Sequence, residues 1–253
     1  WLYVLPNGDV LLAETAAPGT DPGPPRIKGY FFKKFAKKAG SAVDSANRIT
    51  LLRDANRDGV VDTRTVLVGG LRSPFGMALV GSELFVANAD SLVAFSFTVG
   101  HTRITAPPRT VASLPAGRNH HWTKSLVLSP DGRSLYVGVG SNSNIGENGM
   151  DIEQGRAAIW EFDARTGAGH VFASGLRNPI GMDFNPSSGA LWTVVNERDE
   201  IGSDLVPDYM TSVRRGGFYG WPYSYYGHHV DTRVKPPRPD LVGKAIKPDL
   251  PMR

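Results

Sequence analysis

The residues best suited to chemistry lie in a phrase that the sequence repeats. The string "GLRSPFGMAL" spans residues 70–79 and "GLRNPIGMDFNP" spans residues 175–186, which gives Arg72 and Arg177 the same place in the two copies. A degraded copy between them, "GRNHHWTK", gives His121 a similar place. One imidazole between two guanidinium groups suits acid–base chemistry on an anionic or carbonyl-bearing ligand. The other interpretation is that each arginine is a structural tie to an Asp or Glu.

The spacing of the copies indicates the element that positions them. Gly70 and Gly175 are 105 residues apart, which is close to twice the roughly 40–50 residues of a four-stranded propeller blade. Each unit has an apolar strand, a turn rich in Pro, Asn, Asp and Gly, and a second apolar strand, which is the pattern of a β-hairpin. The first of the expected second strands begins at Val10. The other three cover Leu84–Ala89, Leu135–Val139 and Leu191–Val195.

The composition agrees with a turn-rich all-β protein. The chain of 253 residues is 41% hydrophobic and contains 29 Gly and 19 Pro, with few long helical periodicities. We therefore expect one β-propeller domain of four-stranded antiparallel blades over residues 1–253, with about four to five blades in this chain. Because segments that enter successive blades meet at one end of the central channel, Arg72, His121 and Arg177 are expected at one mouth.

The absence of cysteine and of long apolar runs bears on the compartment. Without Cys the chain can form no disulfide and no thiolate metal site, which fits a periplasmic or secreted protein. No stretch approaches the 18 or more apolar residues of a membrane span. The chain starts on Trp1 inside an expected strand and ends in "KPDLPMR" without a closing strand, so we expect a propeller truncated at both ends.

A basic segment interrupts the strand pattern at residues 26–40. The string "RIKGYFFKKFAKKAG" holds five lysines and places Phe31, Phe32 and Phe35 at helical spacing, which predicts a short basic amphipathic helix. We expect its Phe face to pack on the propeller while its lysines stay in water. Attachment to an anionic membrane surface is the alternative. Nucleic-acid binding is not expected, because the chain has no groove-reading motif and no basic stripe elsewhere.

The string "DANRDGVVD" has two interpretations. Asp54–Asp62 resembles the first half of a calcium loop, but Thr65 stands where such a loop has a bidentate Glu. A plain Asx-rich hairpin turn explains the same residues and is the interpretation we favour.

An aromatic cluster near the C-terminal end also has two interpretations. Its rings suit stacking on a sugar, and they equally suit the covering of a blade. The members of the cluster are Trp221, Tyr223, Tyr225, Tyr226, His228 and His229.

Four segments of the chain resemble the soluble quinoprotein sugar dehydrogenases, and within them the sorbosone-dehydrogenase-like branch. They are "NRITLLRDANRDG", "HHWTKSLVLSPDGRSLYVGVGSNSN", "GLRNPIGMDFNPSSGALWTVVNERDEIGSDLVPDYM" and "RRGGFYGWPYSYYG". The resemblance implies a six-bladed propeller that holds pyrroloquinoline quinone (PQQ) and Ca²⁺ at the channel mouth and oxidises a sugar or sugar aldehyde. It also implies a small-molecule sugar substrate and an external electron acceptor.

The resemblance further implies roles for single residues. His121, in "HWTKSL", corresponds to the family's catalytic base. Arg177 and Asn178, in the "RNP" turn, correspond to cofactor contacts. Arg72 and Lys124 are further expected cofactor contacts at the same mouth. The family's remaining basic cofactor contacts are expected after the end of this chain.

The backbone oxygens of Asp199 and Glu200 correspond to the calcium ligands, at a place where the glucose-oxidising branch has Gly-Pro. In the implied reaction, neutral His121 takes a hydroxyl proton while hydride leaves the same carbon for the quinone. Ca²⁺ and Arg177 would stabilise the negative charge that develops on the quinone oxygen. Two alternatives stay open: a calcium-dependent lactonase-type propeller with side-chain metal ligands, and a non-catalytic propeller that binds a carbohydrate or a protein partner.

Overall fold

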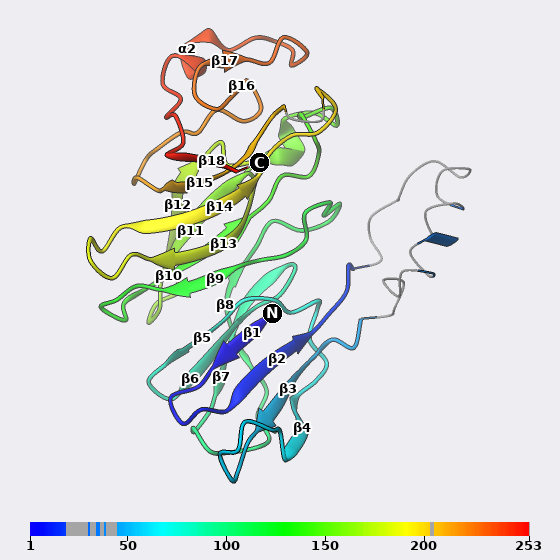
Figure 1. Cartoon of the computed structure of the whole chain (residues 1–253), viewed down its shortest axis with the longest axis vertical. Helices are drawn as coiled ribbons and strands as arrows, with labels where there is room; N and C mark the ends of the chain where they lie inside the picture. Colours follow the sequence, from blue (N-terminus) through cyan, green and yellow to red (C-terminus); the bar gives the residue numbers. More distant parts are fainter. Residues whose placement is uncertain (19–29, 31–33, 36–37, 39–44, 203–204, 253) are drawn as a thin grey trace.

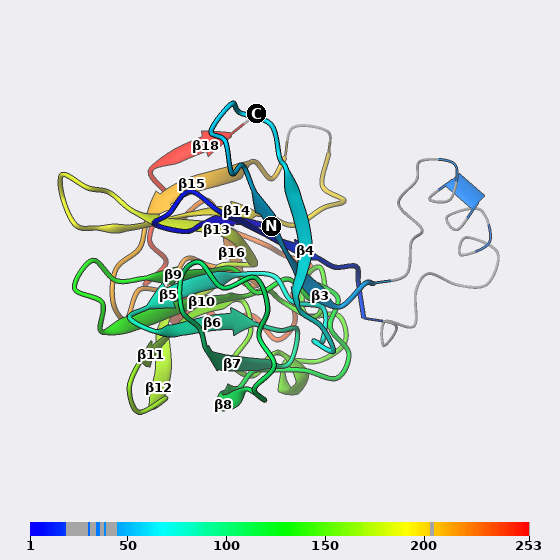
Figure 2. The same cartoon turned by 90° about the horizontal axis from the view of Figure 1, so that it is seen from below.

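Four four-stranded β-sheets follow one another along the described residues. The computed structural model describes residues 1–18, 30, 34–35, 38, 45–202 and 205–252. Each of these sheets has four strands joined to their neighbours in chain order, and every pairing is antiparallel. Figures 1 and 2 show the sheets side by side, from the N-terminal sheet in blue to the C-terminal sheet in yellow and red.

We call the sheets blades 1 to 4. Blade 1 contains β1 (Leu2–Val4), β2 (Val10–Glu14), β3 (Arg48–Arg53) and β4 (Thr63–Val68). Blade 2 contains β5 (Met77–Val80), β6 (Glu83–Ala87), β7 (Ser91–Ser96) and β8 (Arg109–Ser113). Blade 3 contains β9 (Leu126–Leu128), β10 (Ser134–Val139), β11 (Ala158–Asp163) and β12 (Gly169–Ser174). Blade 4 contains β13 (Asn178–Phe184), β14 (Leu191–Asn196), β15 (Asp208–Ser212) and β18 (Leu250–Met252).

Two connections carry further short elements. The connection from β10 to β11 contains the 3₁₀ turn η1 (Asp151–Glu153). Residues 213–249, which we call the excursion of blade 4, contain β16 (Ser224–Tyr225), β17 (His229–Val230) and α2 (Pro239–Val242) before the chain returns as β18. The excursion lies above blade 4 in Figure 1.

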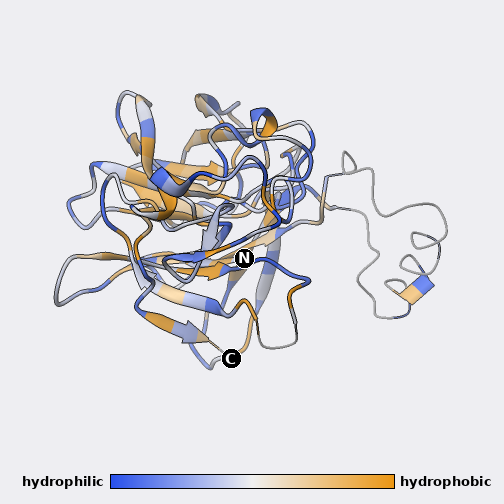
Figure 3. Ribbon diagram, turned by 90° about the horizontal axis from the view of Figure 1, so that it is seen from above, coloured by the Kyte–Doolittle hydropathy of each residue, from blue (hydrophilic) through white to orange (hydrophobic). Residues whose placement is uncertain are grey.

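The inner blades are buried on both faces. In β6, Leu84 and Val86 pack in the core shared with blade 1, whereas Phe85 and Ala87 pack in the core shared with blade 3. Strand β10 alternates in the same way between the cores of blades 2 and 4. Successive side chains of a strand point to opposite faces. A strand that is apolar on both faces therefore packs its own blade against the blade on either side. Figure 3 shows hydrophobic colouring along many of the strands of the molecule.

The predicted all-β propeller of four-stranded blades is confirmed. The second strands predicted from the repeat are β2, β6, β10 and β14, each of which is second in its own sheet. Strand β6 ends two residues earlier than predicted, because the backbone N–H of Asn88 turns back to the carbonyl of Ser91 (2.8 Å). The two further strands that a four-stranded blade requires are also found, for example as β3 and β4 in blade 1 and as β11 and β12 in blade 3.

The first strands of blades 2, 3 and 4 are in contact with one another. Strand β5 contacts β9, and β9 contacts β13. The segments that lead into these inner strands are in contact too: the ring centroids of Trp1 and Phe75 are 5.0 Å apart, and those of Phe75 and Trp122 are 6.2 Å apart. The repeated phrases, which directly precede β5, β9 and β13, therefore share one end of the channel.

The basic insertion at residues 26–40 lies mostly outside the described residues. Tyr30, Lys34, Phe35 and Lys38 have helical conformation. The Phe35 side chain is 65% exposed, so the prediction that it packs on protein is wrong for this residue; the predictions for Phe31 and Phe32 concern residues outside the described part. Lys34 and Lys38 are exposed as well. No helix in the described residues is long and apolar enough to cross a membrane.

The loop between β3 and β4 is an Asx-rich turn. The Asp54 carboxylate accepts the backbone N–H groups of Asp58 (3.2 Å) and Gly59 (2.8 Å). The Asp62 carboxylate accepts those of Ala55 (2.6 Å) and Asn56 (3.3 Å). These bonds match the hairpin-turn interpretation of the sequence.

Candidate active site at the channel mouth

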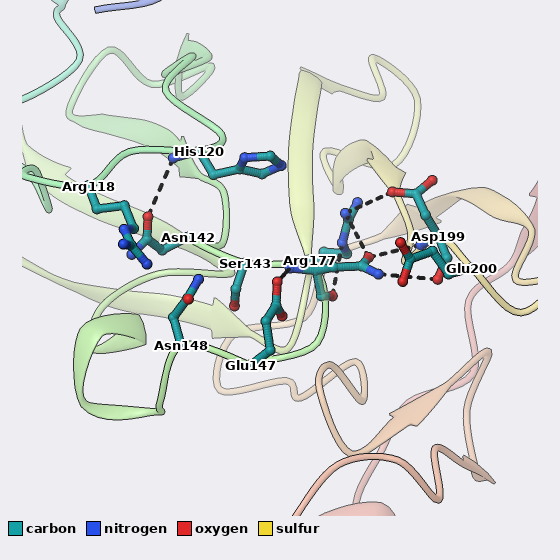
Figure 4. A pocket seen from close by; sticks show the side chains of 10 residues that line it. Arg118, His120, Asn142, Ser143, Glu147, Asn148, Arg177, Asp199 and Glu200 are labelled. Atoms are coloured by element: carbon teal, nitrogen blue, oxygen red, sulfur yellow. Dashed lines mark hydrogen bonds and ion pairs between the residues drawn. The ribbon is translucent and has the colours of Figure 1, made fainter. Parts of the chain in front are cut away.

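A cavity of about 440 Å³ lies between blades 3 and 4. Its walls come from the segment before β9, the segment after β10, the start of β13 and the segment after β14. In an antiparallel hairpin the first strand begins where the second ends, so these four segments share the end of the channel named above. Figure 4 shows the lining side chains, which are Arg118, His120, Asn142, Ser143, Asn144, Glu147, Asn148, Arg177, Asp199 and Glu200.

Arg177 is held firmly beside this cavity. The residue is 3% exposed, and its Nη1 donates to the carbonyl of Glu197 (2.6 Å). Its Nη2 contacts the carboxylate of Asp199 (3.2 Å), whose side chain is 77% exposed. The arginine is thus fixed while its counterion is free to turn into water. An anionic ligand could replace that carboxylate without moving the guanidinium.

Asn144 joins the two blades at this point, and sequence reasoning missed it. Its side-chain Oδ1 accepts from Arg177 Nη2 (3.0 Å) and from the backbone N–H of Asp199 (2.9 Å), and its Nδ2 donates to the Asp199 carbonyl (3.2 Å). Its own carbonyl accepts from Arg177 Nε (3.2 Å) and Trp221 Nε1 (2.9 Å). The polar run "SNSN" that follows β10 indicates a polar segment at this point. No local pattern identifies the distant partners of Asn144.

A buried carboxyl, also missed, holds the wall of the cavity in place. Glu153 of η1 accepts the backbone N–H of Asn142 (2.7 Å) and the hydroxyl of Ser143. Burial raises the pKa of this carboxyl above its ordinary value, and the two hydrogen bonds and nearby Arg156 oppose the rise. The segment after β10 is therefore anchored from beneath, although it has no regular secondary structure.

His121 has the protonation state that a general base requires. Its Nδ1 lies 2.8 Å from the carbonyl of Ser141 and 3.1 Å from the Ser141 hydroxyl oxygen, whose own proton is donated to Ser143. Both neighbours can only accept, so Nδ1 carries the ring proton and Nε2 keeps its lone pair. Burial, followed by the positive charge of Arg177, lowers the pKa of His121 to about 3, and the imidazole is neutral at physiological pH.

Asn178 and His121 approach each other at Gly140. A Cβ atom built on Gly140 would overlap the side-chain oxygen of Asn178 and lie 2.5 Å from the Cβ of His121. The blade contact is completed by a hydrogen bond from the Ser141 N–H to the Arg177 carbonyl (2.7 Å). The side-chain oxygen of Asn178 is buried and accepts no hydrogen bond from the described residues.

The backbone at Asp199 and Glu200 is close to the cavity but already engaged. The Asp199 carbonyl accepts from Asn144 Nδ2, and the Glu200 carbonyl accepts from Arg233 Nη2 (3.0 Å). Each carbonyl retains a second lone pair. In the part of the chain that the structure describes, no three His, Cys, Asp or Glu side chains form a metal-binding cluster. A lactonase-type site built on such side chains gains no support from these residues.

The structure places the other two predicted cofactor contacts away from the cavity. Arg72 has a side chain that is 76% exposed and pairs with Asp90 (2.9 Å), which matches the structural-tie interpretation. Lys124 is fully buried at 0% exposure, and its Nζ donates to Trp122 O (3.0 Å). Neither lines the cavity, and His121 and Asn178 do not line it either; their neighbours His120 and Arg177 do. For Lys124 this geometry favours an indirect role over direct contact with a cofactor.

The aromatic cluster of the excursion is largely engaged within the protein. Trp221 is buried, and the ring of Tyr225 stacks on that of His229 at 5.6 Å. Arg238 lies over the Tyr223 ring and Lys247 over the Tyr226 ring. These contacts favour the interpretation that the cluster covers a blade.

A buried ion pair fastens the excursion to the end of β14. Arg198 donates to Asp231 (2.6 Å), and their side chains are 2% and 3% exposed. The adjacent Glu197 is buried as well, and burial raises its pKa to about 8. The Glu197 carbonyl accepts from Arg177 Nη1 and Arg198 follows it directly, so the excursion and the cavity share one support.

Fold and site together define a β-propeller with a polar cavity at one channel mouth. A family model described as TrAA12-like matches residues 42–214, and the chain belongs to this family. A PQQ-dependent sugar dehydrogenase of Hypocrea jecorina is 22% identical over 205 residues, which cover 70% of this chain and 48% of that protein. The chain thus spans about half the length of this curated relative.

Solved structures show the same fold. The calcium structure of the Trichoderma reesei family AA12 enzyme superposes with a TM-score of 0.73 at 17% identity, covering 98% of this chain and 65% of that one. The holo form of the pyranose dehydrogenase PQQ domain from Coprinopsis cinerea gives a TM-score of 0.69 at 18% identity, covering 98% and 63%.

Proposed function

We propose that this chain forms the cofactor-facing blades of a PQQ-dependent dehydrogenase that oxidises an aldose or sugar aldehyde. The observation that carries the proposal is the arrangement of neutral His121, fixed Arg177 and orphaned Asn178 at one blade contact, in a chain that belongs to the TrAA12-like family. The finer points, namely sorbosone-like substrates, assistance by Ca²⁺ and a periplasmic or secreted location, are part of the proposal.

The cavity has the chemistry to hold such a cofactor. Arg177, which lines the cavity, offers a desolvated guanidinium to an anionic group, and the next residue, Asn178, has a buried amide oxygen that lacks a partner in the described residues. The carbonyls of Asp199 and Glu200, with the exposed carboxylates around them, are hard oxygen ligands of the kind that Ca²⁺ prefers. When bound, PQQ supplies a two-electron acceptor for the hydride of the oxidised carbon.

A side chain of the protein has to accept the hydroxyl proton of the substrate. The Nε2 lone pair of His121 accepts the hydroxyl proton of the sugar or aldehyde hydrate, because Nδ1–H is fixed on Ser141. The low pKa of His121 keeps its Nε2 free of a proton at neutral pH. Arg177 then offsets negative charge that develops opposite the base.

Titration of the purified protein with PQQ, followed by absorbance with and without CaCl₂, tests the proposal. We expect saturable binding that weakens on chelation of Ca²⁺. Arg177→Gln should weaken it by about 10- to 100-fold, as for the loss of a charged hydrogen bond, whereas exposed Arg165→Gln should leave it unchanged. Absence of binding, or equal binding by the Arg177→Gln variant, would exclude the proposed cofactor site.

A further inference from the structure

Lys124, three residues after the candidate base His121, is buried without a carboxylate as an ion-pair partner in the described residues. The Lys124 side chain is completely buried, and no ion pair to it is found in the described residues. Burial of a cation costs several kcal/mol unless hydrogen bonds compensate. Burial, followed by the positive charge of Arg156, lowers the pKa of Lys124 to about 7, while the carboxylate of Asp90 opposes this.

The three protons of this ammonium group reach oxygens of a single segment. Nζ donates to the carbonyls of Trp122 (3.0 Å) and His121 (3.4 Å) and to the side-chain oxygen of Asn119 (3.3 Å). The segment before β9 has no regular secondary structure. Lys124 therefore ties together the two peptide units that hold the base, which are otherwise without a ladder of backbone bonds.

A second buried cation completes the support. Arg156 Nη1 donates to the same Asn119 oxygen (3.0 Å), and its Nη2 donates to the carbonyls of Ala116 (2.9 Å) and Arg118 (3.1 Å). Two adjacent cations thus bind one loop from within. The charged groups that face them are Asp90 from blade 2, already paired with Arg72, and Glu153 from η1, beside Arg156.

We propose that Lys124 is a positioning residue that fixes the backbone of His121, so that its imidazole stays hydrogen-bonded to Ser141 in the tautomer that leaves Nε2 without a proton. This inference rests on the proposed function for its kinetic consequence. Its structural consequence, a single fixed tautomer of His121, does not depend on the reaction. The positive charge of Lys124 also contributes to the lowered pKa of His121.

The test compares Lys124→Met with the exposed control Lys244→Met in the reconstituted protein. A displacement of about 1 Å in a base costs roughly 100-fold in rate, so we expect the kcat of Lys124→Met to fall about 10- to 100-fold. The dissociation constant for PQQ and the KM for the sugar should stay within about threefold. Lys124→Arg, which keeps the charge and the donors, should recover part of kcat. A PQQ affinity lost at unchanged kcat would instead assign Lys124 to direct cofactor binding and overturn the proposal.

Imidazole ¹⁵N NMR of the protein without cofactor gives a readout independent of activity. The wild-type spectrum should show His121 as the Nδ1–H tautomer, and Lys124→Met should show exchange between tautomers and a higher pKa for this ring. An unchanged His121 signal in the variant would contradict the proposal even if the protein bound no PQQ. Should Lys124→Met not fold, Asn119→Ala removes the oxygen that accepts from both Lys124 and Arg156. We expect this variant also to show exchange between the His121 tautomers and a higher pKa for the His121 ring.

Discussion

At the scale of the residue, the site depends on close approach across the contact of blades 3 and 4. Gly140 leaves no space for a methyl group between Asn178 and His121. The Gly140→Ala variant should therefore push the two side chains apart and lower kcat by about 10- to 100-fold, because misplacement of a base by about 1 Å costs that much. Steady-state kinetics with PQQ at saturation measures the loss.

Gly69→Ala is the matched control for this substitution. A Cβ there would meet only Arg48 Cβ at 4.0 Å, so activity and stability should be close to those of the wild-type protein. If Gly140→Ala retained full kcat, the tight contact would have no bearing on catalysis.

The charge state of His121 should be visible in the stability of the protein. Its pKa of about 3 in the folded protein lies below the ordinary value of 6.5, so between these values the unfolded chain binds more protons than the folded one. The free energy of unfolding contributed by this group therefore rises from pH 3 to pH 6.5 and is lost as the pH falls. Urea denaturation between pH 4 and 7 should show a shallower pH dependence for His121→Asn. Parallel curves for the two proteins would mean that His121 titrates normally.

At the scale of the element, the excursion of blade 4 is tied to β14 by the buried pair of Arg198 and Asp231. Removal of one partner leaves the other charge buried, so Arg198→Met should lower the free energy of unfolding by about 3–5 kcal/mol. The double variant Arg198→Met with Asp231→Leu should recover most of that loss. Chemical denaturation of both variants measures the difference.

The exposed pair of Arg238 and Asp240 provides the control, since Arg238→Met there should change stability by less than about 1 kcal/mol. An equal effect of Arg198→Met and Arg238→Met would show that the buried pair does not fasten the excursion.

The strands and turns of the blades could be predicted because they depend on residues that are close in the sequence. Alternation of apolar residues in β6 and β10 and the turns between hairpin strands identify the blades, since both depend on neighbours in sequence. The contacts of Asn144 are not local: it meets Arg177 and Asp199 across 33 and 55 residues. The sequence position of Lys124 predicts that it lies at the mouth, but whether its side chain faces the cavity or the interior depends on Arg156 and Asn119, which no short-range pattern reveals.

At the scale of the whole molecule, four chain segments from two blades build one cavity. The repeated phrase explains how: each copy leads into the inner strand of its blade, so Arg177 and His121 arrive at the same mouth although they differ in role. Similar positions of the repeat hold the buried guanidinium of Arg177 in one copy and the neutral imidazole of His121 in another. Arg72, in a third copy, remains an exposed ion pair.

The central claim is that His121 accepts the substrate proton at this mouth. The direct test is the rate of sugar-dependent dye reduction by the protein reconstituted with PQQ and Ca²⁺, for wild type, His121→Asn and the exposed control His101→Asn, with bound PQQ measured in parallel. We predict that His121→Asn lowers turnover by roughly 10²- to 10⁴-fold, the usual contribution of a general base, while PQQ binding survives and His101→Asn matches the wild type. Near-normal dye reduction by His121→Asn would contradict the account.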